Sequence, residues 1–555
     1  MPISPIRFSG LASGLDTENI IKELMNAHRI PLNRLMQQRQ LLEWQKEAYR
    51  EVNRLMVNFR KAVEPLRFQG TFLAKKANVS DTTLANVTAS NNAVEGTYTL
   101  TVKQLAKGAS MTSKQLSYDT LDTPLIVNDD QGNPITIPDK IKINGQEVDF
   151  TSFKADGKLT VGEFVSAVNA MSSETKVRVS YDTTTKRFFF ISTITGSDAK
   201  IDFSANIDNA DAKKFLEDAI GIIVDPSSLD PSNPDDLKIL DQLTGKNAEI
   251  VFLGETFQFN TNTININGLT IQLVKDPGGT PITTTITVSR DTDAIYNNIK
   301  TFIDEYNKLV DEVNKKLQEP RYRDYPPLTK EQKEQMKEKE IELWEEKAKS
   351  GMIRNDSLIS GFMAQLRLIA YSTVEPVDSS KWSNGVTNSA LKHLAALGIE
   401  TGSYVDENGK LVYGERGKLY IKDEAKLRQA ISENPDDVMM LFTARPNPID
   451  PDQTGTAIDQ EHLGLGHRLY NQVNLAISQL SEKAGSVNSL MLVDNSTLGE
   501  RIKDIDERIA RMQDRLVMIE QRYWSQFTAM ERALARMNMQ SAWLAQTFGG
   551  GGQQS

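Results

Sequence analysis

A seven-residue repeat near the C-terminal end constrains this chain more than any other feature of its sequence. Large apolar or aromatic residues occupy every seventh position from Ile502 to Leu544, and a companion set follows three residues behind as far as Ile519. Two such positions per heptad are typical of a helix that packs along another helix in a coiled coil. The first set is Ile502, Ile509, Leu516, Tyr523, Met530, Met537 and Leu544, and the second is Ile505, Met512 and Ile519. A single helix has nothing to bury this stripe against, so we expect a helical partner.

The N-terminal end carries a second and weaker heptad repeat. One position is taken by Leu35, Leu42, Tyr49, Met56 and Val63, and the other by Gln38, Gln45, Val52, Phe59 and Leu66. The two glutamines are polar where a coiled coil is usually apolar, so the seam is expected to be loose at its start and tighter towards Leu66. The candidate oligomerisation residues are the apolar members of the two repeats, from Leu35 to Phe59 and from Ile502 to Leu544.

Capping signals predict where these two helices begin. Asp16 is a good N-cap, and Glu18 places a carboxylate against the positive end of the first helix. Pro31 is expected to interrupt that helix or to restart it at a first turn, because proline has no backbone N–H. Thr497 and Glu500 have the spacing of a capping box, which predicts Thr497 as the N-cap of the last helix.

The middle of the chain has the alternating pattern of β-strands. The segment GTYTLTV (96–102) alternates β-branched or aromatic residues with others, and YDTTTKRFFFIST indicates a turn followed by a strand. The segments IKINGQEVDF (141–150) and ININGLTIQL (264–273) share Ile-x-Ile followed by Asn-Gly, the dipeptide that favours a two-residue hairpin turn. The repetition favours related hairpins in two β domains, although Asn-Gly hairpins also recur by chance in β proteins.

Three other segments have simple interpretations. A helix is predicted from Asp291, with an apolar face that runs from Ile295 to Leu317. Residues 328–349 interleave opposite charges, which is typical of a solvated helix rather than a binding tail. Residues 225–236 are rich in Pro, Asp and Ser and predict an exposed acidic loop. Clustered oxygen ligands would also suit calcium, but the spacing is not that of an EF-hand loop.

No pattern of catalytic or cofactor-binding residues stands out. The net charge of −10 argues against nucleic acid and anionic membranes, since both need clustered Lys and Arg, and no apolar run reaches the roughly 18 residues of a membrane span. Without cysteine there is no disulfide and no thiolate site, which fits either a cytosolic protein or an exported one that crosses a narrow channel unfolded. His462 and His467 lie five residues apart, whereas helical zinc pairs lie about four apart. We therefore expect no enzyme, no cofactor and no metal site.

Several long blocks, in the right order, resemble one family. FSGLASGLDTENIIKELM and EGTYTLTVKQLAKGAS are similar to the start of flagellar filament-capping proteins, also called hook-associated protein 2. SRDTDAIYNNIKTFIDEYNKLVDEVN and RIARMQDRLVMIEQRYWSQFTAMERALARMNMQSAWLAQTFGG resemble the later parts of the same proteins. The likeness covers both ends and most of the body, and it is looser at 113–245.

The resemblance implies an α+β multidomain fold, with terminal coiled-coil helices and a helical stalk that carries two β-rich head domains. The expected parts are an N-terminal leg at 1–42, partly disordered and then helical; a stalk helix at 43–75; a discontinuous head domain at 76–112 and 246–290; an inserted head domain at 113–245; a helical stalk with a small β/α segment at 291–495; and a C-terminal coiled-coil leg with a flexible tail at 496–555.

The resemblance also implies a function without covalent chemistry. Such proteins form a ring, commonly a pentamer, at the distal tip of the bacterial flagellum, outside the cell, where they retain exported flagellin and promote its folding and polymerisation. The implied partners are further copies of the chain, flagellin, the hook–filament junction proteins and an export chaperone, and for some members host mucin or surface glycans. The type III export route without a cleaved signal peptide favours legs that stay partly disordered until assembly.

Three other classes stay open on the sequence alone. A surface adhesin would carry its function in the head. Another axial flagellar protein, such as a flagellin or a junction protein, would share the helical ends and the β middle. An enzyme with an unrecognised site in the head is the third. The blocks GTYTLTV and WEEKAKSG favour the cap.

Overall fold

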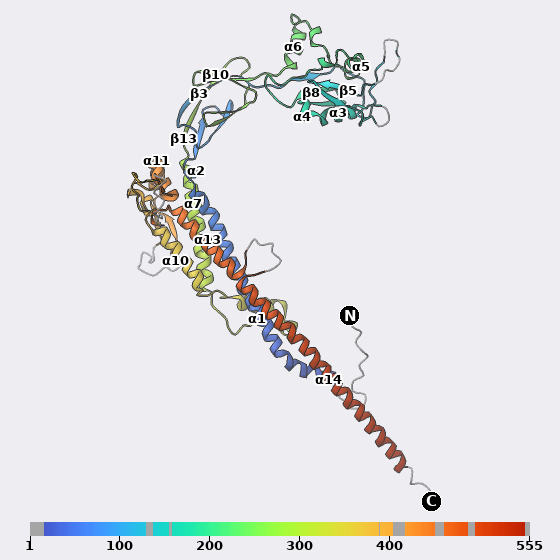
Figure 1. The fold of residues 1–555 in the computed structure, drawn as a ribbon, viewed down its shortest axis with the longest axis vertical. Helices are drawn as coiled ribbons and strands as arrows, with labels where there is room; N and C mark the ends of the chain where they lie inside the picture. The colour runs from blue at the N-terminus through green and yellow to red at the C-terminus, as the bar shows by residue number, and fades with distance from the viewer. Residues whose placement is uncertain are drawn as a thin grey trace. The chain divides into compact units, whose positions relative to one another are not determined.

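The computed structural model describes most of the chain, in two compact units. The described residues are 16–128, 132, 137–154, 158–387, 389–402, 417–449, 460–486 and 494–549. The first unit comprises Met1–Phe72 and Thr292–Ser555, and the second comprises Leu73–Asp291. A mainly helical first unit and a β-rich second unit confirm the expected α+β class (Figure 1). The outermost parts of the two expected legs, residues 1–15 and 550–555, lie outside the described residues.

The first unit is built around two long helices, one from each terminal region, that pack against each other. Its main helices are α1 (Thr17–Val63), α7 (Thr292–Gln318), α10 (Ser357–Tyr371), α13 (Leu465–Ala484) and α14 (Thr497–Gly549). Helix α1 packs against α13, α14 and α7, and α10 packs against α13. The smaller elements are α2 (Gln69–Phe72), α8 (Lys330–Glu334), α9 (Glu338–Lys349), α11 (Glu424–Glu433), α12 (Pro435–Thr443), β14 (Trp382–Ser383), β15 (Ile399–Thr401), β16 (Leu419–Ile421) and β17 (Asn447–Pro448).

The predicted apolar face of α7 is confirmed, and it builds the core of this unit. Its buried side chains recur at helical spacing from Ile295 to Leu317. The rings of Phe302 and Tyr306 lie 6.0 and 5.8 Å from the ring of Phe59 on α1. The charged segment 328–349 is solvated, as predicted, but it forms the two helices α8 and α9 rather than one, and Ala348 is the buried residue of α9.

The predicted start of α1 is confirmed, whereas the predicted effect of Pro31 is wrong. The carboxylate of Asp16 accepts a hydrogen bond from the backbone N–H of Asn19 at 3.0 Å, which is the N-cap bond. Helix α1 then continues without a break through Pro31. Met25 and Leu32 on either side of this proline are both buried against α14. This packing offsets the one backbone hydrogen bond that proline removes from the helix.

The predicted N-cap of α14 is also wrong, by one residue. Thr497 is already helical, and the hydroxyl of Ser496 accepts a hydrogen bond from the backbone N–H of Gly499 at 3.1 Å. The hydroxyl of Thr497 instead donates to the backbone carbonyl of Glu482 at 3.4 Å. Serine and threonine are both favoured N-cap residues, and here they are adjacent. The capping-box spacing alone therefore could not show which of the two is the cap.

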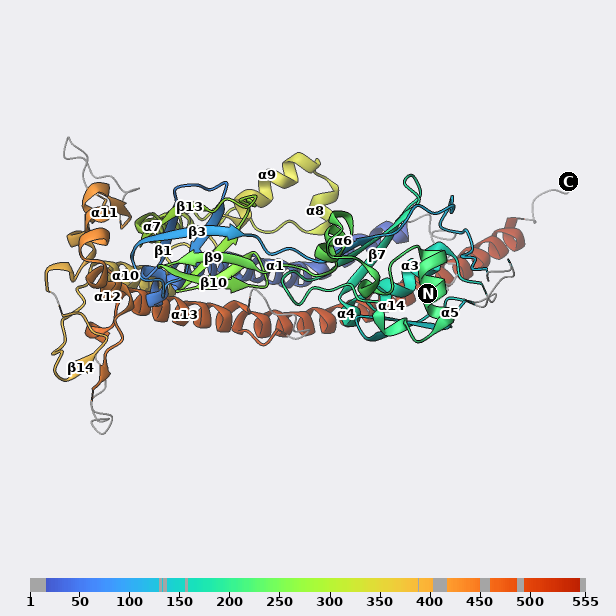
Figure 2. The same cartoon turned by 90° about the horizontal axis from the view of Figure 1, so that it is seen from above.

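The second unit contains two β-rich cores. The first core lies between a five-stranded antiparallel sheet, in the order β1-β13-β3-β9-β10, and a three-stranded sheet, in the order β11-β12-β2. The strands are β1 (Lys75–Val79), β2 (Ala85–Ala89), β3 (Gly96–Gln104), β9 (Ala248–Phe252), β10 (Glu255–Phe259), β11 (Thr263–Ile266), β12 (Leu269–Leu273) and β13 (Ile282–Arg290). The chain leaves this core after β3 and returns to it at β9 (Figure 2).

The intervening residues form the second core, which is rich in phenylalanine. The rings of Phe150, Phe164 and Phe215 are fully buried and contact one another, with 5.7 to 6.3 Å between their centroids. The elements are β4 (Ser110–Thr112), β5 (Lys140–Ile143), β6 (Gln146–Asp149), β7 (Val177–Asp182), β8 (Arg187–Ser192), α3 (Val161–Ala170), α4 (Ser172–Thr175), α5 (Ala210–Lys214), a π-helical turn (Phe215–Ile220) and α6 (Pro234–Leu243).

Both predicted Asn-Gly hairpins are present, one in each core. Asn144-Gly145 joins β5 to β6, and Asn267-Gly268 joins β11 to β12. All four residues have positive φ, which is the conformation that this turn requires. The strands on either side alternate buried and exposed residues, as the pattern predicts.

The acidic segment 225–236 is exposed but is not entirely a loop. Pro226–Ser228 form a short 3₁₀ turn, and α6 begins at Pro234. The side chain of Asn233 caps α6, and a proline at the first helical position suits its missing N–H. Among the described residues no group of three or more His, Asp or Glu side chains gathers at metal-binding distance.

Candidate functional site

The candidate site is the seam between the two terminal helices, which run antiparallel and side by side (Figure 1). The direction follows from two cross-pairs: His28 lies beside Tyr523, and Arg39 lies beside Asp506. The seam buries Ile21, Met25 and Leu32 of α1 against Ile505, Ile509 and Leu516 of α14. Leu35, Leu42, Met512, Ile519, Tyr523, Trp524 and Phe527 pack against this cluster and are partly buried.

The predicted repeat residues therefore fall into four groups. Eight of them, Leu35, Leu42, Ile505, Ile509, Met512, Leu516, Ile519 and Tyr523, belong to the seam. The second group is fully buried and consists of Tyr49, Val52, Met56 and Phe59. These residues lie in the upper part of α1, residues 49–63, which packs on α7 and α13. Ile502 is buried on α14 but lies outside the seam cluster. Met530, Met537 and Leu544 are exposed by 37%, 60% and 46%.

Three polar contacts join α1 to α14 and to the residues just before it, and no sequence pattern pointed to them. The Nε2 atom of His28 lies 3.0 Å from the hydroxyl of Tyr523, and the guanidinium of Arg39 lies 2.5 Å from the carboxylate of Asp506. The ammonium of Lys46 lies 2.6 Å from the carboxylate of Asp494. Each pair joins residues more than four hundred positions apart, so a single sequence offers no local signal for it.

Asp494 is the electrostatic centre of the junction between α13 and α14. Burial alone raises the pKa of this carboxyl, but the Lys46 ammonium and the hydroxyl and amide of Ser496 outweigh burial and lower the pKa to about 2. The carboxylate accepts a hydrogen bond from the backbone N–H of Ser496 at 3.0 Å, immediately before α14 begins. A single side chain thus ties α1 to the start of α14.

A second polar group locks the upper part of α1 to its neighbours. The hydroxyl of the buried Tyr49 donates to the carboxylate of Asp356 at 2.5 Å. Burial, and then this bond, raises the pKa of Tyr49 well above its usual value. Asp356 also caps α10 by accepting from the backbone N–H of Ile359 at 3.0 Å. The ammonium of Lys483 on α13 lies 3.5 Å from the same carboxylate and 4.4 Å from the centre of the Tyr49 ring. Three helices therefore meet at the carboxylate of Asp356.

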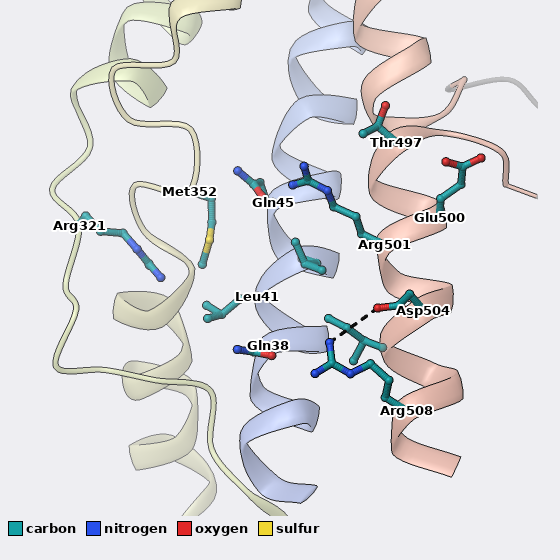
Figure 3. A pocket seen from close by; sticks show the side chains of 12 residues that line it. Gln38, Leu41, Gln45, Arg321, Met352, Thr497, Glu500, Arg501, Asp504 and Arg508 are labelled. Atoms are coloured by element: carbon teal, nitrogen blue, oxygen red, sulfur yellow. Dashed lines mark ion pairs between the residues drawn. The ribbon is translucent and has the colours of Figure 1, made fainter. Parts of the chain in front are cut away.

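A cavity of about 820 Å³ opens where the two glutamines interrupt the seam (Figure 3). Gln38, Leu41 and Gln45 reach it from α1, and Arg321 and Met352 reach it from the opposite side (Figure 3). The rest of its lining is Leu42 of α1 with Thr497, Glu500, Arg501, Asp504, Ile505 and Arg508 of α14. Asp504 and Arg508 form an ion pair at 3.7 Å. A lining that combines apolar side chains with charged ones is typical of a surface where proteins meet.

Two family models cover most of the chain. The model described as flagellar hook-associated protein 2 C-terminus matches residues 245–539, and the model described as flagellar hook-associated protein 2 N-terminus matches residues 13–109. These matches define the class, a flagellar hook-associated protein. Among the described helices, none is both long and apolar enough to cross a membrane.

Similar whole chains narrow the class to a family. The flagellar hook-associated protein 2 of Halalkalibacterium halodurans is 32% identical over 575 aligned positions, which cover 98% of this chain and 100% of that protein. The protein of the same name from Thermotoga maritima is 24% identical, over 98% and 95% of the two chains. The chain therefore belongs to the flagellar hook-associated protein 2 family. Among solved structures, the D1-D2-D3 domains of the Escherichia coli flagellar cap protein align with 83% of this chain and 99% of theirs, at 17% identity and a TM-score of 0.45.

Proposed function

We propose that this protein caps the distal tip of the bacterial flagellar filament, outside the cell. In this proposal a ring of subunits, a pentamer by analogy with the family, retains exported flagellin and promotes its folding and polymerisation during elongation. Membership of the hook-associated protein 2 family supports the flagellar role. The role needs no catalytic residue, cofactor or metal.

One observation carries the assembly part of the proposal: α14 continues past the end of its partner. Figure 1 shows α14 running on beyond the described start of α1. After Phe527 the apolar positions of the heptad continue as Met530, Met537 and Leu544, all exposed. Among the described residues, no part of the chain covers this stripe. Apolar side chains at heptad spacing are buried most effectively by another helix. We infer that the far end of α14 packs on helices of neighbouring subunits, either further copies or flagellin.

The same proposal assigns the remaining parts of the chain. The two β-rich cores are the head domains that form the plate of the ring, one at 76–112 with 246–290 and one inserted at 113–245. The helices around 43–75 and 291–495 are the stalk, and the legs are 1–42 and 496–555. The hook–filament junction proteins and an export chaperone complete the set of partners, and for some family members host mucin or surface glycans would join it.

A clean gene deletion tests the capping role. The expected result is hooks without filaments in electron micrographs, together with soluble flagellin in the medium, and restoration of filaments by the intact gene. Normal filaments without leaked flagellin would contradict a cap and would move a surface adhesin to first place.

A variant in which Met530, Met537 and Leu544 are all changed to Ser tests the assembly part of the proposal. We expect it to fold normally and to fail in complementation, because these side chains contribute to no core of the described chain.

We also propose that the legs gain most of their order on assembly. In the described residues the two legs pack on each other along one apolar stripe. Circular dichroism of the full chain and of a fragment of residues 70–490 during heating measures this directly. We expect the extra helical signal of the full chain to melt early and gradually. A cooperative transition of fully helical ends would contradict partly disordered legs.

A further inference from the structure

The turn between β9 and β10 is strained in a way that the other two hairpins are not. Leu253-Gly254 joins these strands with φ of 54° and 88°, the same left-handed geometry as Asn144-Gly145 and Asn267-Gly268. Asparagine tolerates this region, whereas a leucine side chain is disfavoured there. Leu253 is 63% exposed, so contacts within the chain do not offset the strain. A strained, exposed apolar residue at such a tip needs another explanation.

Strand β10 is an outer edge of its sheet (Figure 2). A two-residue turn makes Phe252 and Glu255 a hydrogen-bonded pair, and the pairing then alternates along the hairpin. Phe257 therefore bonds back to β9, while the backbone groups of Thr256 and Gln258 point away from it. Within the described part of the chain, no backbone group bonds to these outward groups. They form a row of donors and acceptors with which another extended backbone can pair.

This edge has few of the devices that usually prevent pairing. Proteins protect edge strands with lysine, proline or a bulge. The opposite edge, β1, begins with Lys75 and Lys76, whereas β10 reads Glu-Thr-Phe-Gln-Phe, contains neither residue type and pairs with β9 in unbroken register. Phe259 packs on the core, but Phe257 does not and is 36% exposed. The edge therefore offers both outward backbone groups and a partly exposed aromatic ring, whose centroid lies 6.4 Å from that of Phe259.

We propose that β10 pairs with β10 of a second copy of this chain, antiparallel about a two-fold axis at Phe257. In this register Thr256 lies opposite Gln258 of the second copy, so the outward backbone groups of both strands bond to each other. The two Phe257 rings meet at the axis, and Glu255 lies opposite Phe259 of the second copy, so no like charges face each other. Leu253 comes to lie at the end of the other strand, beside Thr261.

The segment is thus complementary to itself, which is why a second copy is the occupant rather than an unrelated strand. A two-fold contact uses the same surface on both molecules, whereas the contacts that close a ring join two different surfaces. The β10 contact is therefore separate from the ring of the proposed function, and it stands or falls without it.

Engineered cysteines test the contact and its register in the full chain, which has no cysteine of its own. Phe257 faces itself across the axis as a non-hydrogen-bonded pair, for which the Cα atoms lie about 4.5 Å apart, within the range of a disulfide. Phe257→Cys is expected to give a covalent dimer on mild oxidation. Thr256→Cys and Gln258→Cys are the matched controls. Each lies opposite a different residue, so neither single variant should cross-link, whereas the double variant should.

A second measurement uses the strained turn and needs no cysteine. Leu253→Asn should raise the melting temperature of the chain, because the strain is relieved, and should weaken dimerisation about tenfold in sedimentation velocity, because an apolar contact is lost. Asn267→Leu, the converse change in the other turn, should lower the melting temperature and leave dimerisation unchanged.

Equal cross-linking of the three single cysteine variants, or no cross-linking of any cysteine variant, would overturn the proposal. So would Leu253→Asn binding itself as strongly as the unchanged chain. Filament growth in the deletion strain is a separate readout and would still judge the capping role.

Discussion

The upper part of α1 (residues 49–63) and its lower part (residues 35–42) carry one heptad repeat but have different neighbouring helices. Between Tyr49 and Val63 the repeat residues are fully buried, because α7 and α13 both pack on this part of the helix. Between Leu35 and Leu42 they are only partly buried, because α14 is the one neighbour in the seam. A heptad repeat indicates which face of a helix is buried, but it does not indicate how many neighbours bury it. The upper part behaves as the core of a domain, and the lower part as half of an interface.

The largest expected effect comes from removing an aromatic ring from the upper part. Phe59→Ala should destabilise the first unit by about 3–5 kcal/mol, because the cavity would lie among side chains that cannot collapse into it. Urea denaturation followed by far-UV circular dichroism measures this loss. Met36→Ala on an exposed position of the same helix is the control and should change stability by less than about 0.5 kcal/mol. A loss below about 1 kcal/mol for Phe59→Ala would mean that the two parts of α1 do not differ.

A matched change in the lower part should have a smaller and more local effect. Leu516→Ala removes a buried seam residue of α14 and should cost about 2 kcal/mol, felt only by the paired legs. Hydrogen exchange should then speed up along α1 before residue 46 and along α14, while α7 and α13 keep their protection. Faster exchange in α7 and α13 would contradict the division, since it would make the seam part of the stalk core.

Acid should loosen the junction between the leg and the stalk through Asp494. Its pKa is about 2 in the folded chain, below the ordinary value of 3.8, so the folded state binds fewer protons than the unfolded state in that range. The ionised carboxylate therefore contributes stability above pH 3.8 that is lost as the pH falls towards 2. The contribution is about 1–2 kcal/mol, allowing for screening of a side chain that is 31% exposed.

Asp494→Asn isolates this contribution. The variant should be less stable than the unchanged chain at pH 7, and the difference should shrink steadily as the pH falls below 3.8. Denaturation midpoints at several pH values between 7 and 3 give the comparison. A constant difference across this range would mean that the carboxylate acts by shape and hydrogen bonding rather than by its charge.

Much of this fold could be predicted from local pattern. The apolar face of α7 and both Asn-Gly hairpins are confirmed, because periodicity and turn chemistry act over a few residues. The effect of Pro31 was wrong for the opposite reason. The packing that keeps α1 continuous comes from α14, and the sequence around Pro31 does not indicate it.

The candidate site shows the same limit. Gln38 and Gln45 predicted a loose stretch of the seam, and a cavity lies there. The sequence could not show that the two repeats pair antiparallel, nor that Lys46 meets Asp494, because these facts depend on residues that are distant in the chain. Exposed positions such as Met537 look identical to buried ones until the length of the partner helix is known.

The smallest expected effect concerns the first turn of α14, where two neighbouring residues compete as caps. Ser496→Ala should cost about 1 kcal/mol, because it removes the acceptor of the Gly499 amide at a buried helix start. Thr497→Ala should cost only a few tenths, since its hydroxyl makes one long hydrogen bond to Glu482 and no cap bond. Thermal unfolding of both variants decides between them, with hydrogen exchange of α14 as the local readout. If Thr497→Ala proved the more costly, the capping-box spacing would describe the helix start better than the Ser496 bond does. Helix α14, and with it the seam, would then begin one residue later than the hydrogen bond of Ser496 indicates.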